Sequence, residues 1–189
     1  MSSPESFDNP GQLCLRGSLM LADPGLRDPN FFRTVLLLTE HRPDMGAHGY
    51  VLNRPMGKTV GDLLTGTDFA ALSRIPVFIG GPVSQEKLTF AVLGWDAGAQ
   101  KLNFTTHLSV GDARRHHLEG DAVRAFVGYS GWSEGQLENE LRQHAWITRK
   151  AAPEIIAPKS NDELWASLLT SMGPYFGLLA RMPEDPSLN

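Results

Sequence analysis

The stretch AFVGYSGWSEGQLENEL, residues 125–141, decides the predicted fold. Its first five residues are apolar or small and rich in β-forming types, which predicts a buried strand. The glycines at 128–132 tolerate backbone conformations that other residues avoid, so a tight turn is predicted there. Ser133 followed by Gln136 is typical of a helix start, because the serine oxygen can accept a helical N–H while the amide reaches back. The stretch therefore predicts strand, turn and helix in succession.

Similar runs of β-forming residues recur earlier in the chain. They are Leu13 to Leu21, Thr34 to Thr39, Gly49 to Asn53, Val77 to Ile79 and Leu88 to Leu93. Some of these strands are joined by connections too short for a helical crossover, so regular βαβ alternation is not expected. We predict an α+β fold, in which helices pack on a mixed β-sheet in a single compact domain.

Further helix starts are predicted at serine or threonine residues that an acid follows three positions later. These are Thr59, Ser109 and Ser160, and the last two helices are expected to end at Gly120 and at Gly173-Pro174. The final helix carries a one-sided apolar stripe, which indicates a face packed in the core. The stripe consists of Leu164, Trp165, Leu168, Leu169 and Met172.

The length of 189 residues and the 41% hydrophobic content are those of an ordinary globular protein. Both ends are rich in turn-forming residues, so we predict flexible tails at 1–11 and 183–189 around one domain at 12–182. The single cysteine, Cys14, requires no oxidising compartment, and the N-terminus does not resemble a signal peptide. Apolar runs are too short to span a membrane. A cytoplasmic protein is predicted.

The formal net charge of -4 offers no long-range attraction to nucleic acid, which is therefore a disfavoured partner. We expect instead an unknown small molecule or protein as the partner. Three segments that combine glycine or proline with polar groups at strand ends could form a ligand site. The candidate residues are Asn53, Arg54, Gly80, Gly81, Pro82, Gly128, Gly131, Trp132 and Gln136. The alternative is that the glycines serve turns, Trp132 lies in the core and Arg54 is simply exposed.

No residue is predicted to be catalytic, and neither a metal nor a cofactor is expected. Ser130 misses the G-x-S-x-G pattern by one position, since Trp132 stands where the second glycine belongs. The six histidines form no metal-binding spacing. Cys14 lies within an apolar alternation and is expected to be buried and inert.

The succession of motifs resembles the YqgE/AlgH family of bacterial proteins over residues 12 to about 180. The resemblance rests on the segments 17–24, 28–35, 40–41, 46–55, 80–83, 128–132, 135–141 and 145–146. It implies a one-domain α+β fold with a mixed sheet, a cytoplasmic bacterial protein, and no assigned activity or cofactor. One branch of the family carries the label of transcriptional regulator.

The chain departs from the family pattern at several positions. Ser130 stands where alanine is usual and His48 where methionine is usual, and the arginine and histidine common after 80–83 are missing. We expect a non-catalytic binding or regulatory protein whose three glycine-marked segments converge on one cleft. One alternative is a hydrolase or transferase of a small acidic molecule, with Arg54 as the anion clamp and Glu134, Glu138 or His48 as the base. Another alternative is direct DNA binding through the basic stretch 113–118.

Overall fold

The computed structural model describes residues 14–42, 44–157 and 161–182. Within them, nine strands, five α-helices and two 3-10 helices alternate irregularly, which confirms the α+β class. In chain order they are β1 (Ser18–Ala22), β2 (Val35–Arg42), β3 (Gly46–Val51), β4 (Pro55–Thr59), α1 (Val60–Leu63), η1 (Thr67–Leu72), β5 (Pro76–Ile79), β6 (Val83–Asp96), β7 (Lys101–Leu108), α2 (Val110–Glu119), β8 (Ala122–Trp132), α3 (Gln136–Arg142), β9 (Trp146–Lys150), η2 (Pro153–Ile155), α4 (Asn161–Thr170) and α5 (Pro174–Ala180).

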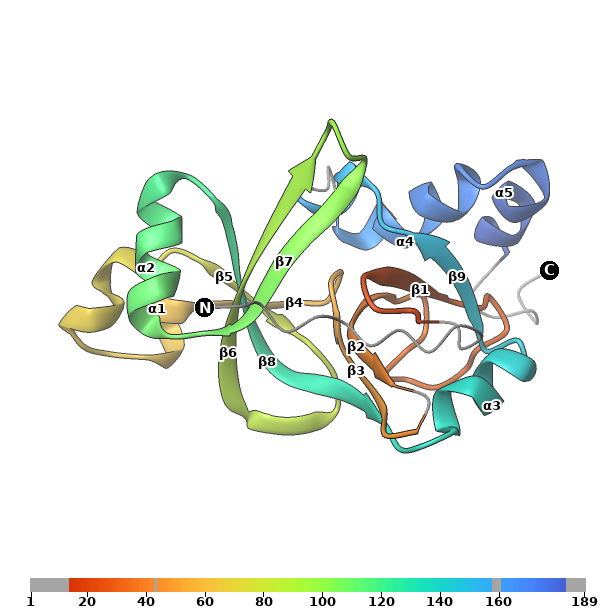
Figure 1. The fold of residues 1–189 in the computed structure, drawn as a ribbon, viewed down its shortest axis with the longest axis horizontal. Coiled ribbons are helices and arrows are strands. Elements are labelled where there is room, and N and C mark those ends of the chain that lie inside the picture. The colour runs from red at the N-terminus through yellow and green to blue at the C-terminus, as the bar shows by residue number, and fades with distance from the viewer. Residues whose placement is uncertain (1–13, 43, 158–160, 183–189) are drawn as a thin grey trace, which may run out of the picture.

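The strands form one mixed sheet in the order β4-β5-β8-β3-β2-β1-β9, with β6 paired to both β7 and β8 (Figure 1). Strand β8 is the centre of this arrangement. Its first half pairs in parallel with β5 on one edge and antiparallel with β6 on the other. Beyond Gly128, the edge that β5 occupied is taken over by β3, which pairs with residues 130–132.

The predicted turn at 128–132 is wrong, because β8 continues through this stretch to Trp132. Gly128 has a φ of 68°, and it lies where the partner of β8 changes from β5 to β3. A Cβ atom at Gly128 would come within 2.6 Å of the Gly81 carbonyl oxygen. The glycine therefore permits both a bend and a close approach between two backbones within a continuous strand.

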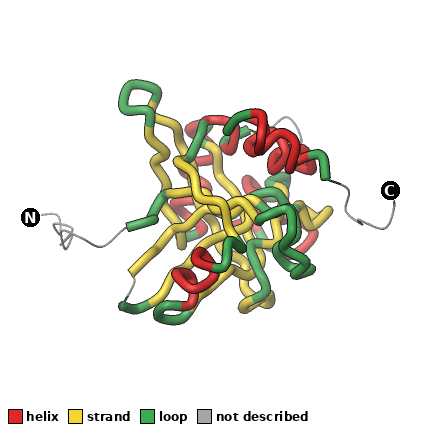
Figure 2. Tube along the Cα trace, turned by 90° about the vertical axis from the view of Figure 1, so that its right-hand side faces the viewer, coloured by secondary structure: helices red, strands yellow, loops and turns green. Residues whose placement is uncertain are grey.

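The helices cover different parts of the sheet, as Figures 1 and 2 show. Helix α4 packs four residues of the predicted stripe into the main core, where Leu164, Trp165, Leu168 and Leu169 are buried. The fifth, Met172, lies beyond the helix, which ends at Thr170, and is partly buried against the same core. Helix α3 contributes to a second core, while α1, η1 and α2 surround a third. The indole N–H of Trp165 donates to the Ala22 carbonyl at 2.9 Å, which ties α4 to β1. The chain thus forms one compact domain, as predicted.

Two of the predicted helix starts are confirmed. Ser109 caps α2, whose last turn is closed by Gly120 in the left-handed conformation. Thr59 and Asp62 form a capping box at α1. The third, Ser133, does not cap α3, because that helix begins at Gln136 after Gly135. The Gln136 side chain instead accepts from the Ser133 N–H at 3.1 Å, which closes a turn before the helix.

Strands β4, β7 and β9 were not predicted from the sequence, and residues 14–17 precede β1 although a strand was predicted there. The predicted tails at 1–11 and 183–189, and the helix start at Ser160, lie outside the described residues. None of the helices in the described ranges is long and apolar enough to cross a membrane.

Candidate functional site

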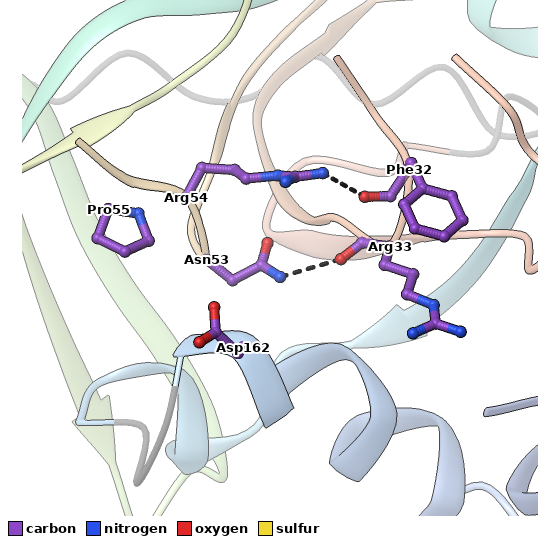
Figure 3. A pocket seen from close by; sticks show the side chains of 6 residues that line it. All are labelled: Phe32, Arg33, Asn53, Arg54, Pro55 and Asp162. Atoms are coloured by element: carbon purple, nitrogen blue, oxygen red, sulfur yellow. Dashed lines mark hydrogen bonds between the residues drawn. The ribbon is translucent and has the colours of Figure 1, made fainter. Parts of the chain in front are cut away.

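A cavity of about 550 Å³ opens where the chain leaves β3, and we name it the Arg54 cavity. The loop before β2, the segment after β3 and the start of α4 supply its walls (Figure 3). Its lining residues are Phe32, Arg33, Asn53, Arg54, Pro55 and Asp162. Two residues predicted from the sequence to bind a ligand, Asn53 and Arg54, therefore lie side by side in this wall.

Asn53 holds one wall of the cavity in place. Its side-chain oxygen accepts from the Val35 N–H at 2.8 Å, and its amide nitrogen donates to the Arg33 carbonyl at 3.0 Å. The residue is buried, with 6% of its surface exposed. Because both ends of the amide already have partners in the protein, Asn53 acts as a clamp between the end of β3 and the loop before β2.

Arg54 is half-buried and separates two cavities. It lines the Arg54 cavity on one side and a smaller cavity of about 200 Å³ on the other, where Gly81 and Pro82 also lie. One terminal nitrogen of its guanidinium donates to the Phe32 carbonyl, as Figure 3 shows. Within the described residues no carboxylate forms an ion pair with this guanidinium. An arginine has five N–H donors, so donors remain for an anion.

Arg33 extends away from Arg54, toward the C-terminal helices (Figure 3). Its guanidinium donates to the Met182 carbonyl at 2.5 Å and stacks 5.3 Å from the centre of the Trp165 ring. Its backbone has a φ of 52°, a left-handed conformation that is uncommon for a non-glycine residue. Arg33 thus joins the loop before β2 to the C-terminal helices.

Across the cavity from Asn53, the carboxylate of Asp162 projects from the first turn of α4 (Figure 3). Asp162 is exposed. The cavity therefore presents a cation on one wall and an anion on another. Such an arrangement suits a small ligand that carries both a carboxylate and hydrogen-bond donors.

The glycines at 80 and 81 pack against β8. A Cβ atom at Gly80 would lie 2.5 Å from the Gly128 carbonyl oxygen, and one at Gly81 would lie 2.3 Å from the Tyr129 carbonyl oxygen. The Ser130 hydroxyl, which is fully buried, donates to the Gly80 carbonyl at 3.1 Å. This contact brings the second and third predicted segments together, but their backbones fill the space between them.

The other residues that were predicted to bind a ligand lie further along β8 and on α3. Gly131 is exposed and pairs with His48 in β3. The Trp132 indole donates to Glu140 at 2.9 Å within the second core, and Gln136 donates to the same carboxylate group at 3.1 Å. None of these three lines either cavity beside Arg54.

The bases considered from the sequence also lie away from Arg54. Glu138 accepts from Nε2 of the buried His41 at 2.8 Å, while Nδ1 of His41 accepts from the Leu15 N–H at 3.0 Å. This pairing resembles a catalytic dyad, but both ring nitrogens are already engaged within the protein. His48 and Glu134 do not line the two cavities beside Arg54 either.

His48 belongs to an aromatic cluster on the sheet. Its ring stacks on Tyr129 with centroids 4.4 Å apart and lies 5.9 Å from His107. Burial lowers the pKa of His48, Glu40 opposes that shift, and His107 adds to it. The pKa of the neighbouring Tyr50 is raised, chiefly by burial. The cluster therefore favours a neutral imidazole.

Sequence reasoning missed Arg124, which is buried at 6% exposure in β8. Its guanidinium donates to the carbonyls of Leu52, Ile155 and Ile156 at 3.1, 2.6 and 3.4 Å. It also lies 5.1 Å from the centre of the Phe78 ring. Burial lowers the pKa of Arg124 to about 10, so it stays charged at neutral pH. No motif marks this residue, because its partners are backbone groups far away in the sequence.

Among the described residues, one group has donor atoms close enough to hold a metal ion. It consists of His116, Glu119 and Asp121 at the end of α2, with the donor atoms within 4.8 Å of one another. His116 already bonds Asp121 at 2.7 Å. Cys14 is exposed, so the expectation that it is buried was wrong, because β1 begins only at Ser18 and residue 14 precedes it.

The fold and the cavity together define a class: a single-domain α+β protein with a nine-stranded mixed sheet and a polar cavity at the exit of β3. The family model described as AlgH-like matches residues 19–176, most of the chain. This chain belongs to the AlgH-like family, as its motifs indicated.

Similar proteins occur in several bacteria. A UPF0301 protein of Streptomyces coelicolor is 37% identical over 187 residues, which cover 93% of this chain and 95% of the relative. A UPF0301 protein of Cytophaga hutchinsonii is 35% identical and covers 92% of this chain and 98% of its own length. These relatives match the whole domain, and their names assign no activity.

Two solved structures share the fold. The crystal structure of a Corynebacterium diphtheriae protein superposes with a TM-score of 0.69 at 22% identity, covering 88% of this chain and 91% of that one. The solution structure of the AlgH protein from Pseudomonas aeruginosa superposes with a TM-score of 0.65 at 25% identity, covering 97% of this chain and 98% of that one. The arrangement of strands around β8 is therefore a property shared with these two proteins.

Proposed function

We propose that this protein is a non-catalytic, cytoplasmic binding or regulatory protein that holds a small carboxylic acid in the Arg54 cavity. The observation that carries this proposal is the guanidinium of Arg54. It is half-buried, lines two cavities, and uses one donor on a backbone carbonyl without a carboxylate partner in the described ranges. A planar fork of N–H groups matches the two oxygens of a carboxylate.

The rest of the cavity supports a ligand with two different ends. Asp162 faces Asn53 from α4 and can accept hydrogen bonds from amino or hydroxyl groups of the ligand (Figure 3). The volume of about 550 Å³ falls in the range of small-molecule sites. A carboxylic acid with hydrogen-bond donors at its other end would satisfy both walls.

The same geometry favours binding over catalysis. A general base must lie within hydrogen-bond reach of the proton that it removes. Glu134, Glu138 and His48 do not line the cavity, and Glu138 already accepts from His41. The hydrolase or transferase expected from the sequence, with Arg54 as its clamp, would need one of these three bases beside the ligand. The carboxylate that does line the cavity, Asp162, is exposed and is assigned here to hold the far end of the ligand.

DNA binding through residues 113–118 has less support. In this stretch Arg115 forms ion pairs with Asp112 at 3.2 Å and with Glu119 at 3.8 Å, and His116 bonds Asp121. Positive charges that are neutralised by neighbouring acids attract phosphate groups weakly. A cytoplasmic location accords with a chain that needs no disulfide.

Native mass spectrometry tests the proposal with the freshly purified protein. We expect the wild type to carry a small carboxylic acid in a fraction of molecules, and the variant Arg54→Met to lose it. Arg115→Met is the matched control, because it removes an exposed arginine outside the cavity. Retention of the same ligand by Arg54→Met, with circular dichroism showing an intact fold, would contradict the proposed site.

A further inference from the structure

A second cavity, of about 340 Å³, lies where the β6–β7 hairpin meets the start of β1 and the end of β9. Three exposed cationic residues line it, and they come from three different segments: Arg16 before β1, Lys101 at the start of β7 and Lys150 at the end of β9. We name it the basic cavity. Figure 1 shows that the hairpin projects beyond the other strands, and its outer end supplies one wall.

Within the described residues, no acidic residue lines this cavity beside the three cations, and none of the three forms an ion pair. The nearest acid along the hairpin, Asp96, is the cross-strand partner of Lys101 and accepts from the Ala99 N–H at 2.9 Å. The whole chain has 21 acidic residues and 17 lysines and arginines. A cavity lined by three cationic residues and no acidic one therefore differs in charge from the chain as a whole. Like charges that share a cavity repel one another, and a bound anion relieves that repulsion.

The wall of the cavity also has an aromatic component. The ring of Phe104 is half-buried, and the guanidinium of Arg16 stacks on it, 4.8 Å from the ring centre. Gly17 has a φ of 82°, and a Cβ atom there would lie 3.6 Å from the Phe104 ring. The stacking limits the directions that the Arg16 guanidinium can take. It leaves the N–H groups at the edge of the guanidinium plane available to an anion.

From this geometry we propose that the basic cavity binds a small organic phosphate through its phosphate group, with the carbon portion against Phe104. Three cations match an anion with two or more negative charges better than a singly charged carboxylate. Lysine and arginine are the side chains that most often bind phosphate. The proposal is independent of the Arg54 cavity, since the two cavities share no lining residue.

The test is an NMR titration of the isotope-labelled protein at low ionic strength with phenyl phosphate, and with benzoate as the probe that keeps the ring but carries one charge. We expect saturable shifts around residues 16–18, 100–104 and 150–151. The affinity read from the shifts of these residues should be at least tenfold higher for phenyl phosphate than for benzoate, whatever benzoate does at the Arg54 cavity. Added salt should weaken the binding, because exposed charges are screened. Equal affinity of the two probes at the residues of the basic cavity would overturn the proposal.

Variants locate the binding. Lys101→Gln and Lys150→Gln should each weaken phenyl phosphate roughly tenfold, which is the effect of one charge-assisted contact. Lys58→Gln and Lys87→Gln are matched controls, since both lysines are exposed and neither lines the cavity. Arg54→Met should leave phenyl phosphate binding unchanged, which separates this site from the other one. Equal weakening by all four lysine variants would show a non-specific surface effect and refute the assignment.

Discussion

Replacing Arg124 with alanine should destabilise the protein by about 3 kcal/mol, a value that follows from its contacts. The guanidinium saturates two buried carbonyls at 3.1 and 2.6 Å and a more distant one at 3.4 Å. Leaving the two closer carbonyls without partners costs about 4 kcal/mol in total. Loss of the arginine stem and of its contact with the Phe78 ring, 5.1 Å away, adds about 2 kcal/mol.

An opposing effect reduces this loss. Burial lowers the pKa of Arg124 to about 10, well below its usual value, so the buried charge itself costs about 3 kcal/mol, and alanine removes that cost. The net loss of stability is about 3 kcal/mol, because the cost of the unpaired carbonyls and of the lost packing exceeds the gain from removing the buried charge. Arg124→Lys should recover little of it, since an ammonium group cannot reach carbonyls on two separate segments with the geometry of a planar fork.

Urea unfolding followed by tryptophan fluorescence measures this difference. The loss of about 3 kcal/mol corresponds to roughly 6–12 °C in melting temperature for a domain of this size. Arg115→Ala is the matched control, since its arginine is exposed and its ion pairs are worth less than about 1 kcal/mol. An Arg124→Ala variant that is no less stable than Arg115→Ala would refute this role of Arg124.

Two further predictions concern the second core and the aromatic cluster. The indoles of Trp132 and Trp146 both donate to Glu140, at 2.9 and 2.8 Å. Glu140→Leu should therefore lower the free energy of unfolding, measured in urea, by about 2–3 kcal/mol and shift the tryptophan emission. An unchanged stability would count against this role of Glu140. Burial lowers the pKa of His48, so the unfolded chain binds its proton more tightly, and stability should fall as the pH drops below the unfolded value of about 6.5. His48→Met should flatten this decline, and a slope identical to that of the wild type would exclude His48 as its source.

Helix ends could be predicted from the sequence where a capping residue and its partner lie close together in the chain. The cap at Ser109 and the terminating glycine at 120 are confirmed, because such contacts lie within four residues of one another. The turn predicted at 128–132 was wrong for the opposite reason. Gly128 serves the close approach of Gly81 to β8, a contact between residues far apart in the chain. Glycine composition alone does not distinguish a turn from such an approach.

Only part of the candidate site could be predicted from the sequence. Arg54 and Asn53 could be selected because polar residues at a strand exit often face a ligand, and they line a cavity. Asp162 comes from a helix more than 100 positions later, and nothing in its own surroundings connects it to them. The same holds for the basic cavity, whose three cations are brought together only by the pairing of β1 with β9 and by the hairpin.

Titration of the isotope-labelled protein with small carboxylic acids, among them glycine and succinate, tests the central claim most directly. We expect saturable shifts at residues 32–35 and 53–55, recovery of the acid chemically unchanged, and loss of the shifts in Arg54→Met but not in Lys101→Gln. Shifts that persist in Arg54→Met, or conversion of the acid during the titration, would contradict a non-catalytic binding site at the Arg54 cavity.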